Sequence, residues 1–224
     1  MSKAQRRKRY KCGTKFTRFN QVDPWVVTCH LANKKKNMGK EGKSDKDALN
    51  RRINQKISLW KGDITKLEVE AIVNAANQAL LGGGGIDGAI HSAAGDSLYQ
   101  ECKLLKGCAT GFTKITRAHN LPSLYILHTI GPVGEYPEKL KSCYESCLQL
   151  CLDYNIKTIA FCGISTGIFG YPLENASKVA CMVIRRWMEN VRNLERIERI
   201  VFCTFLDKEH VCYQKLMKQY FPVA

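Results

Sequence analysis

The chain has 224 residues, of which 45% are hydrophobic, so it can form one domain with a substantial core and an extension. Its formal net charge of +15 is uneven: residues 1–57 hold 17 Lys/Arg against 4 Asp/Glu, and residues 58–224 hold 18 against 16. Any nucleic-acid partner is therefore expected to bind only the first part of the chain. No apolar run approaches the roughly 20 residues that span a bilayer, so we expect no membrane partner.

Residues 1–56 are predicted to form a basic, mostly disordered arm. They contain the clusters Arg6-Arg7-Lys8-Arg9 and Lys34-Lys35-Lys36 and a polar stretch from Asn37 to Asp47 with weak periodicity. An acid-poor start that contains arginine is typical of a mitochondrial transit peptide, whereas a compact basic cluster is typical of nuclear import. We expect an intracellular protein, with nucleus, cytoplasm and mitochondrion all left open.

From residue 57 onward, short β-branched runs alternate with longer helical patterns, which predicts one α/β/α domain over residues 57–224 with a buried, largely parallel sheet. The expected strands are Ile57 to Trp60, Ala71 to Ala75, Thr113 to Arg117, Tyr125 to Ile130, Thr158 to Ile164 and Ile200 to Phe205. The expected helices are Gly88 to Ala94, Ser97 to Leu105, Glu138 to Tyr154, Asn175 to Asn190 and Lys208 to Tyr220.

The eleven cysteines are predicted to be reduced, because no CxxC pair and no signal-peptide core accompany them. Cys143, Cys147 and Cys151 recur every fourth residue and therefore share one face of an expected helix. Buried free cysteine behaves as a small hydrophobic residue. A metal site is the alternative, but no nearby histidine completes a tetrahedral set of ligands. We expect neither a metal nor a cofactor.

Two glycine-containing loops are candidates for binding phosphate groups. The first, Gly82 to Gly85, joins an expected strand to an expected helix, where backbone amides and a helix N-terminus can bind an anion. The second, Ser165 to Gly170, also follows a strand. Because both loops lie at carboxyl ends of parallel strands, they predict a crevice that suits a diphosphate, although flexible loops are the alternative.

The first loop also satisfies the dinucleotide fingerprint GxGxxG, through Gly83, Gly85 and Gly88. That fingerprint belongs on the first strand-to-helix turn and requires an acidic residue about 20 positions later. Leu104 to Gly107 occupies the corresponding region here. The sequence therefore argues against a nicotinamide or flavin dinucleotide site.

Polar side chains near these loops could carry chemistry. Asp87 and His91 share one helical face and could position or activate water, although such pairs are often structural, and a carboxylate there also complements the helix dipole. Asn74 and Asn77 end a strand and could simply form a turn. Phe169, on a glycine-flanked tip, is expected either to cover a ligand ring or to pack against the protein.

A covalent nucleophile is not expected. Cys102 and Cys108 lack the neighbouring base that activates a thiol, and neither a GxSxG elbow nor a GKS/T phosphate loop is present. His119 and His128 have no partner pattern and are predicted to be structural.

The combination of motifs resembles the MacroD-type macrodomains. The resemblance rests on KGDITKLEVEAIVNAANQALLGGGGIDGAIHSAAG (Lys61 to Gly95), followed by TGFTKIT, LHTIGP and ISTGIFGYP, and it runs from about Lys56 to the last residues. It implies an α/β/α sandwich around a mixed sheet. It also implies a monomeric hydrolase that binds ADP-ribose, removes mono-ADP-ribose from modified Asp/Glu side chains of proteins, and deacetylates O-acetyl-ADP-ribose.

The resemblance also implies individual roles. Asp87 would be the catalytic carboxylate that acts on water, with support from His91 and Asn77. Asp63 would receive the adenine amino group, Ile64 would contribute a backbone contact, and Asn77 would hold the distal ribose. The remaining implied ligand-binding residues surround the diphosphate and the distal ribose: Gly83, Gly84, Gly85, Ile86, Asp87, Ser165, Thr166, Gly167, Ile168 and Phe169.

Two positions depart from the family pattern. The family often has HRAAG where this chain has His91-Ser92-Ala93-Ala94-Gly95, and FPCIST where it has Phe161-Cys162-Gly163-Ile164-Ser165-Thr166. The glycine before the second loop is expected to loosen that loop and slow turnover. A reader that binds ADP-ribosylated partners without catalysis is the alternative function, although readers commonly lack the acidic residue after the glycines. A nucleic-acid-associated protein is a third alternative, which depends on the basic arm alone.

Overall fold

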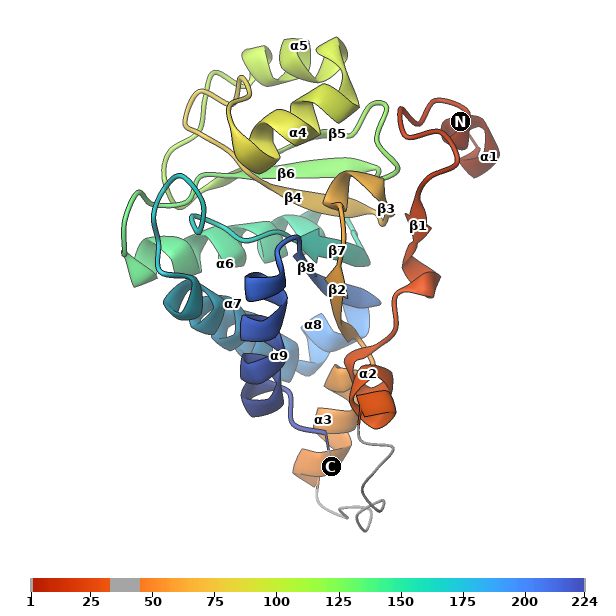
Figure 1. Ribbon diagram of the computed structural model, residues 1–224, viewed down its shortest axis with the longest axis vertical. Coiled ribbons are helices and arrows are strands. Elements are labelled where there is room, and N and C mark those ends of the chain that lie inside the picture. The colour runs from red at the N-terminus through yellow and green to blue at the C-terminus, as the bar shows by residue number, and fades with distance from the viewer. Residues whose placement is uncertain (1, 33–44, 224) are drawn as a thin grey trace.

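A six-stranded sheet forms the centre of the protein in the computed structural model, which describes residues 2–32 and 45–223 (Figure 1). Its strands are β2 (Ile57–Lys61), β4 (Ala71–Ala75), β5 (Thr113–Arg117), β6 (Tyr125–Thr129), β7 (Thr158–Phe161) and β8 (Arg199–Thr204). They lie in the order β2-β8-β7-β4-β6-β5, and only β5 runs antiparallel, to β6. The predicted mixed, largely parallel sheet is confirmed.

Helices cover both faces of this sheet, which confirms the three-layer α/β/α arrangement. Figure 1 shows α4 (Gly85–Ala94) and α5 (Asp96–Leu104) above one face. The opposite face is covered by α6 (Pro137–Asp153), α7 (Leu173–Glu189) and α9 (Asp207–Tyr220), and α8 (Val191–Arg196) follows α7. We call the hydrophobic core beneath α4 and α5 the first core and the core beneath α6, α7 and α9 the second core. Within β4, Ile72 belongs to the first core, whereas Ala71 and Val73 belong to the second, because successive strand residues point to opposite faces.

The cysteines behave as predicted. All eleven are free, and Cys143, Cys147 and Cys151 are buried on one face of α6 within the second core. Burial raises the pKa of Cys151 to about 12, so its thiol stays protonated at neutral pH. These three residues therefore contribute packing.

Most expected elements are present with small shifts at their ends. Helix α4 begins at Gly85, three residues before the expected start, and β7 ends at Phe161 because residues 162–164 already enter the second loop. Three short elements were not expected: α8, the 3-10 helix η2 (Ile64–Lys66) and β3 (Leu67–Glu68).

The predicted disorder of residues 1–56 is wrong for the described part of that segment. It forms α1 (Lys3–Arg7), β1 (Thr17–Arg18), the 3-10 helix η1 (Phe19–Gln21), α2 (Trp25–Ala32) and α3 (Asp45–Asn54), and β1 pairs with β3. Tyr10, Val22 and Trp25 are buried against the domain. Three isolated apolar residues are inconspicuous in a strongly basic composition, yet each one fits a site on the body. Lys34 to Lys36 and most of the polar stretch lie outside the described residues.

Glu68 anchors the N-terminal segment to the domain. Arg7 donates to both carboxylate oxygens, from Nε at 2.8 Å and Nη2 at 2.7 Å, and the Tyr10 hydroxyl donates at 3.0 Å. Burial alone would raise the pKa of Glu68, but these hydrogen bonds and the nearby positive charges lower it. Arg6 donates to the carbonyls of Pro122 and Ser123. Two residues of the first basic cluster are therefore engaged within the molecule.

No helix in residues 2–32 and 45–223 combines the length and the apolar character needed to cross a membrane.

Trp25→Ala should test how tightly the N-terminal segment is attached. The side chain is only 2% exposed and its indole Nε1 donates to the Phe221 carbonyl at 2.9 Å, so we expect a loss of about 3–5 kcal/mol in unfolding free energy. Urea denaturation would measure this loss. Val27→Ala, at a more exposed position of the same helix, should cost much less, and equal losses would contradict the packing described here.

Candidate active site

The glycine run lies at the carboxyl end of β4 and leads into α4. Gly82 has φ +85° and Gly85 has φ +60°, a left-handed conformation that glycine adopts without strain. A Cβ atom added to Gly83 would lie 3.0 Å from Asn77 Nδ2 and 3.2 Å from Asp87 Oδ2. The loop backbone is therefore packed directly on two of the predicted site residues.

Helix α4 and the glycine run also approach each other closely. A Cβ atom on Gly88 would lie 2.3 Å from the Gly83 carbonyl oxygen, a distance at which something must shift. Only a hydrogen fits there. This contact holds the loop against the first turn of α4, where the helix N-terminus faces the carboxyl edge of the sheet.

The second loop meets the first one, as the sequence predicted. A Cβ atom on Gly84 would lie 3.0 Å from Ile168 Cδ1, so the two loops converge. Ser165 is buried in a left-handed conformation with φ 64°, which is unusual for a residue with a side chain and is typical of functional loops. The Ser165 carbonyl accepts from the Tyr171 amide at 2.9 Å, and the Phe169 carbonyl accepts from Gly134 at 2.7 Å. The predicted looseness of this loop stays a prediction.

Asp87 is the buried centre of the site, with 4% of its surface exposed. Asn74 Nδ2 donates to Oδ1 at 2.7 Å, and Asn77 Nδ2 lies 3.5 Å from Oδ2 while it also donates to the Gly82 carbonyl at 2.8 Å. Burial raises the pKa of Asp87, and the Asn74 hydrogen bond and the His91 charge oppose that shift. Asp87 is therefore a carboxyl whose basicity exceeds that of a solvated aspartate.

His91 lies on the same face of α4, as predicted. Its Nε2 is 3.5 Å from Asp87 Oδ1, and that nitrogen has no hydrogen-bond partner within the described residues. Burial lowers the pKa of His91, although the Asp87 charge partly offsets this effect. The neutral imidazole therefore keeps one ring nitrogen as a donor and the other as an acceptor beside the carboxylate.

Behind Asp87, a buried network reaches across the sheet to His128. Asn74 Nδ2 also lies 3.0 Å from His128 Nδ1, and His128 Nε2 lies 2.9 Å from Thr116 Oγ1. Burial lowers the pKa of His128 to about 3, so its ring is neutral. Because the Asn74 amide is the donor, His128 Nδ1 accepts and Nε2 carries the proton. The structural role predicted for His128 thus consists in positioning Asn74.

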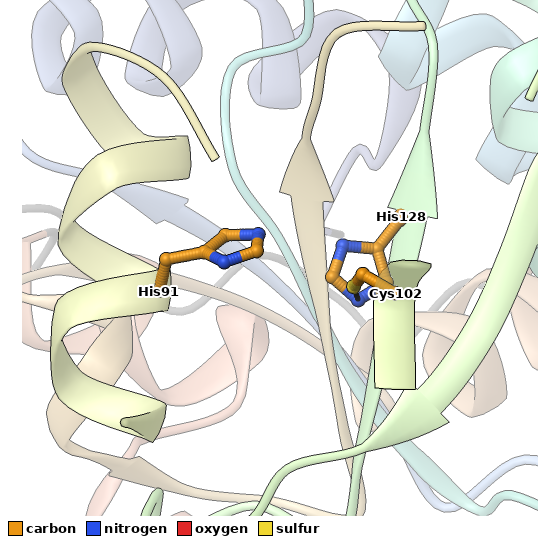
Figure 2. Close-up of side chains that lie close together, drawn as sticks. All are labelled: His91, Cys102 and His128. Atoms are coloured by element: carbon orange, nitrogen blue, oxygen red, sulfur yellow. Dashed lines mark hydrogen bonds between the residues drawn. The ribbon is translucent and has the colours of Figure 1, made fainter. Parts of the chain in front are cut away.

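One group of potential metal ligands lies beside this network. Figure 2 shows the His91 ring directed toward His128 and Cys102, and the donor atoms of the three residues lie within 4.8 Å of one another. Cys102 Sγ is 3.8 Å from His128 Nε2. A metal would have to displace the Thr116 contact and deprotonate Cys102, whose pKa burial raises to about 12. We therefore interpret the group as packing around the network.

Asp63 follows β2 at the same carboxyl edge of the sheet. It caps η2, where its Oδ1 accepts from the Thr65 amide at 3.0 Å and hydroxyl at 2.6 Å, and Lys66 lies 3.1 Å from Oδ2. These groups lower the pKa of Asp63, although burial opposes them, so it is ionised. Three strand spacings separate β2 from β4 in the sheet. Asp63, which follows β2, therefore lies roughly 14 Å from the end of β4 that leads to Asp87. Ile64 follows Asp63 and is buried.

Sequence reasoning missed Phe205 and Thr116, and it gave His128 only an unspecified structural role. Phe205 is 69% exposed directly after β8, beside Gly62, because the Gly62 amide bonds to the Thr204 carbonyl at 2.9 Å. An aromatic residue at the carboxyl end of a strand was its only signal. The link of Thr116 and His128 to Asn74 could not be read from the sequence, since it depends on the pairing of β4 with β6 and of β6 with β5.

The fold and the site together define an α/β/α domain with two converging loops and one buried carboxylate at the carboxyl edge of its sheet. The Macro domain family model matches residues 73–180. The chain is 43% identical to the ADP-ribose glycohydrolase MACROD1 of Rattus norvegicus over 231 residues, which cover 100% of this chain and 86% of that protein. It is 45% identical to the ADP-ribose glycohydrolase MACROD2 of Homo sapiens over 189 residues, which cover 82% and 44%.

Solved structures of macrodomains are also similar to this chain. The Trypanosoma brucei macrodomain in complex with ADP-ribose has a TM-score of 0.77 and 37% identity, covering 91% of this chain and 77% of that one. The macro domain of ganglioside induced differentiation associated protein 2 has a TM-score of 0.80 and 32% identity, covering 94% and 99%. The chain belongs to the Macro domain family, as the sequence motifs predicted.

Gly88→Ala should disrupt the packing of the glycine run against α4. The added methyl group would meet the Gly83 carbonyl, and we expect a loss of about 1–3 kcal/mol in unfolding free energy, measured by urea denaturation. Ser92→Ala, at an exposed position of the same helix, is the control and should be nearly neutral. If both variants were equally stable, the close packing of the loop on α4 would be refuted.

Proposed function

We propose that this protein binds ADP-ribose and hydrolyses the ester that joins mono-ADP-ribose to modified Asp or Glu side chains of proteins. The single observation that carries the proposal is the buried Asp87 carboxyl, held by Asn74 between the glycine run and α4. Similarity to proteins named ADP-ribose glycohydrolases supports the same conclusion.

The binding groups along the sheet edge fix the orientation of ADP-ribose, with the adenine near Asp63 and the distal ribose near Asp87. The glycine run and the second loop offer backbone amides and the N-terminus of α4 to the diphosphate. The adenine lies at the far end, where the Asp63 carboxylate accepts its amino group and Phe205 offers an exposed ring for stacking. The distal ribose then lies beside Asn77 and Asp87, which brings the ester to the only buried carboxylate that faces the two loops among the described residues.

Asp87 acts on a water molecule in this arrangement. Its carboxylate accepts a hydrogen bond from the water and increases the nucleophilicity of the water oxygen, while neutral His91 helps to orient it. Addition of water across the ester releases a free carboxylate side chain and ADP-ribose. O-acetyl-ADP-ribose contains the same kind of ester, so the same residues suit its deacetylation.

A covalent intermediate is disfavoured by the state of the nearby thiol. Cys102 is fully buried, and its raised pKa keeps it protonated, which makes it a poor nucleophile. The nucleic-acid alternative is also weakened, because Arg6 and Arg7 of the first basic cluster bond within the molecule. A reader without catalysis remains the competing function, and Asp87 decides between the two.

Asp87→Asn should separate catalysis from binding. The amide keeps the size of the side chain but cannot act as a base, so we expect turnover of a glutamate-linked ADP-ribosyl protein to fall by about 10²–10⁴-fold, with ADP-ribose affinity nearly unchanged. Asp96→Asn, in the first turn of the neighbouring helix α5, is the matched control. Release of ADP-ribose and calorimetric titration are the measurements. Tight binding without turnover in the unaltered protein would make it a reader.

The pH dependence of hydrolysis should report the environment of Asp87. Because burial raises its pKa above the ordinary 3.8 and the carboxylate is the active form, kcat/KM should fall as the pH falls through that raised value. The Asn74 hydrogen bond lowers this pKa, so Asn74→Ala should move the acid limb to higher pH by about one unit. An acid limb that did not move would show that another group controls the rate.

A further inference from the structure

A surface groove of about 450 Å³ lies beside the proposed active site. It is lined by Gln78, Ala79, Leu81, Lys103, Lys106 and Gly107. Its first three residues belong to the loop between β4 and the glycine run, and the others belong to the end of α5 and the turn that follows. The proposed function does not use this groove.

The groove has a well-defined floor. Lys106, with φ 55°, and Gly107, with φ 76°, reverse the chain after α5. The Cys108 amide then donates to the Gln78 carbonyl at 2.9 Å, and a Cβ atom on Gly107 would lie 2.7 Å from the same oxygen. The Gln78 side chain donates to Thr110 Oγ1 at 3.2 Å. The two walls are therefore joined through their backbones.

The groove borders the proposed position of the distal ribose. Gln78 directly follows Asn77, and Leu81 directly precedes Gly82, whose carbonyl accepts from Asn77 Nδ2 at 2.8 Å. Asn77 Nδ2 in turn lies 3.5 Å from Asp87 Oδ2. A polypeptide attached to the distal ribose leaves the proposed site here, and the groove is directly adjacent.

Two uncompensated positive charges border the groove. Lys103 and Lys106 are exposed, and neither has an ion-pair partner among the residues that the structure describes. Elsewhere on the domain, Lys141 and Lys178 pair with carboxylates on their own helices. The exposed side chain of Leu104, at 80%, adds an apolar surface between the two lysines.

From this charge and position we propose that the groove binds an acidic segment of the modified protein, next to the residue that carries ADP-ribose. The inference rests on the proposed function and adds the class of protein substrate that the site prefers. Two lysines on a body that is otherwise nearly neutral match the carboxylates of a short acidic peptide. A nucleic acid would require a longer row of positive charges along its backbone.

The test uses the full chain and a double variant, Lys103→Glu/Lys106→Glu. Its matched control is Lys46→Glu/Lys218→Glu, which makes the same charge change at exposed lysines on α3 and on the last turn of α9. Figure 1 shows α3 and the C-terminus at the opposite end of the molecule from α5. The probes are two peptides with one ADP-ribosylated glutamate each, flanked either by glutamates or by glutamines, together with O-acetyl-ADP-ribose.

We expect the groove variant to lose about tenfold in kcat/KM on the glutamate-flanked peptide, an effect that should shrink in 0.5 M salt. Its kcat/KM on the glutamine-flanked peptide and on O-acetyl-ADP-ribose should match that of the control variant. An equal loss on all three probes, or no loss on the acidic peptide, would overturn the inference. Tighter binding of an oligonucleotide than of the acidic peptide at these lysines would also overturn it.

Failure of the proposed function can be distinguished by binding. Calorimetric titration with amide-linked versions of both peptides, which resist ester hydrolysis, requires no catalysis. Selective loss of affinity for the acidic peptide in the groove variant supports the groove even if the unaltered protein hydrolyses nothing. Equal affinities of the unaltered protein for the two peptides would refute it.

Discussion

The hydrogen bond from Asn74 to Asp87 is the interaction on which the site depends. A carboxylate that is almost fully buried is costly unless a polar group satisfies it, and the 2.7 Å bond from Asn74 provides that partner. The same bond joins the carboxyl end of β4 to the first turn of α4. Its geometry is in turn held by neutral His128, so the position of the Asp87 carboxyl depends on the neighbouring strand β6.

The remainder of the molecule places binding groups along one edge of the sheet. Parallel strands bring their carboxyl ends to the same side, so Asp63 and Asp87 lie at separate points along one edge of the sheet although both belong to the first half of the domain. The two loops converge between them. The basic groove beside Asn77 lies next to this line and is the surface that we propose for the modified protein.

The N-terminal segment shows why composition can mislead. Residues 1–57 carry a large excess of positive charge, which favours a disordered arm when averaged over the segment. Folding depends on particular contacts instead: Glu68 is a buried carboxylate that requires cations, and Arg7 supplies a bidentate pair. Glu68 lies 61 positions from Arg7, so no local sequence pattern predicts this ion pair.

The sequence by itself determined the class of the fold and the two loops, because strand alternation and glycine runs are local properties with local physical causes, whereas the catalytic role of Asp87 came only from the resemblance to a known family. It also placed His91 on the face of Asp87 and buried Cys143, Cys147 and Cys151 together. Only the tertiary structure decided the link from Asp87 through Asn74 to His128, the exposure of Phe205 beside β2, and the attachment of the N-terminal segment. Each of these depends on which strand pairs with which and on contacts between distant residues, and neither can be obtained from the periodicity of a single segment.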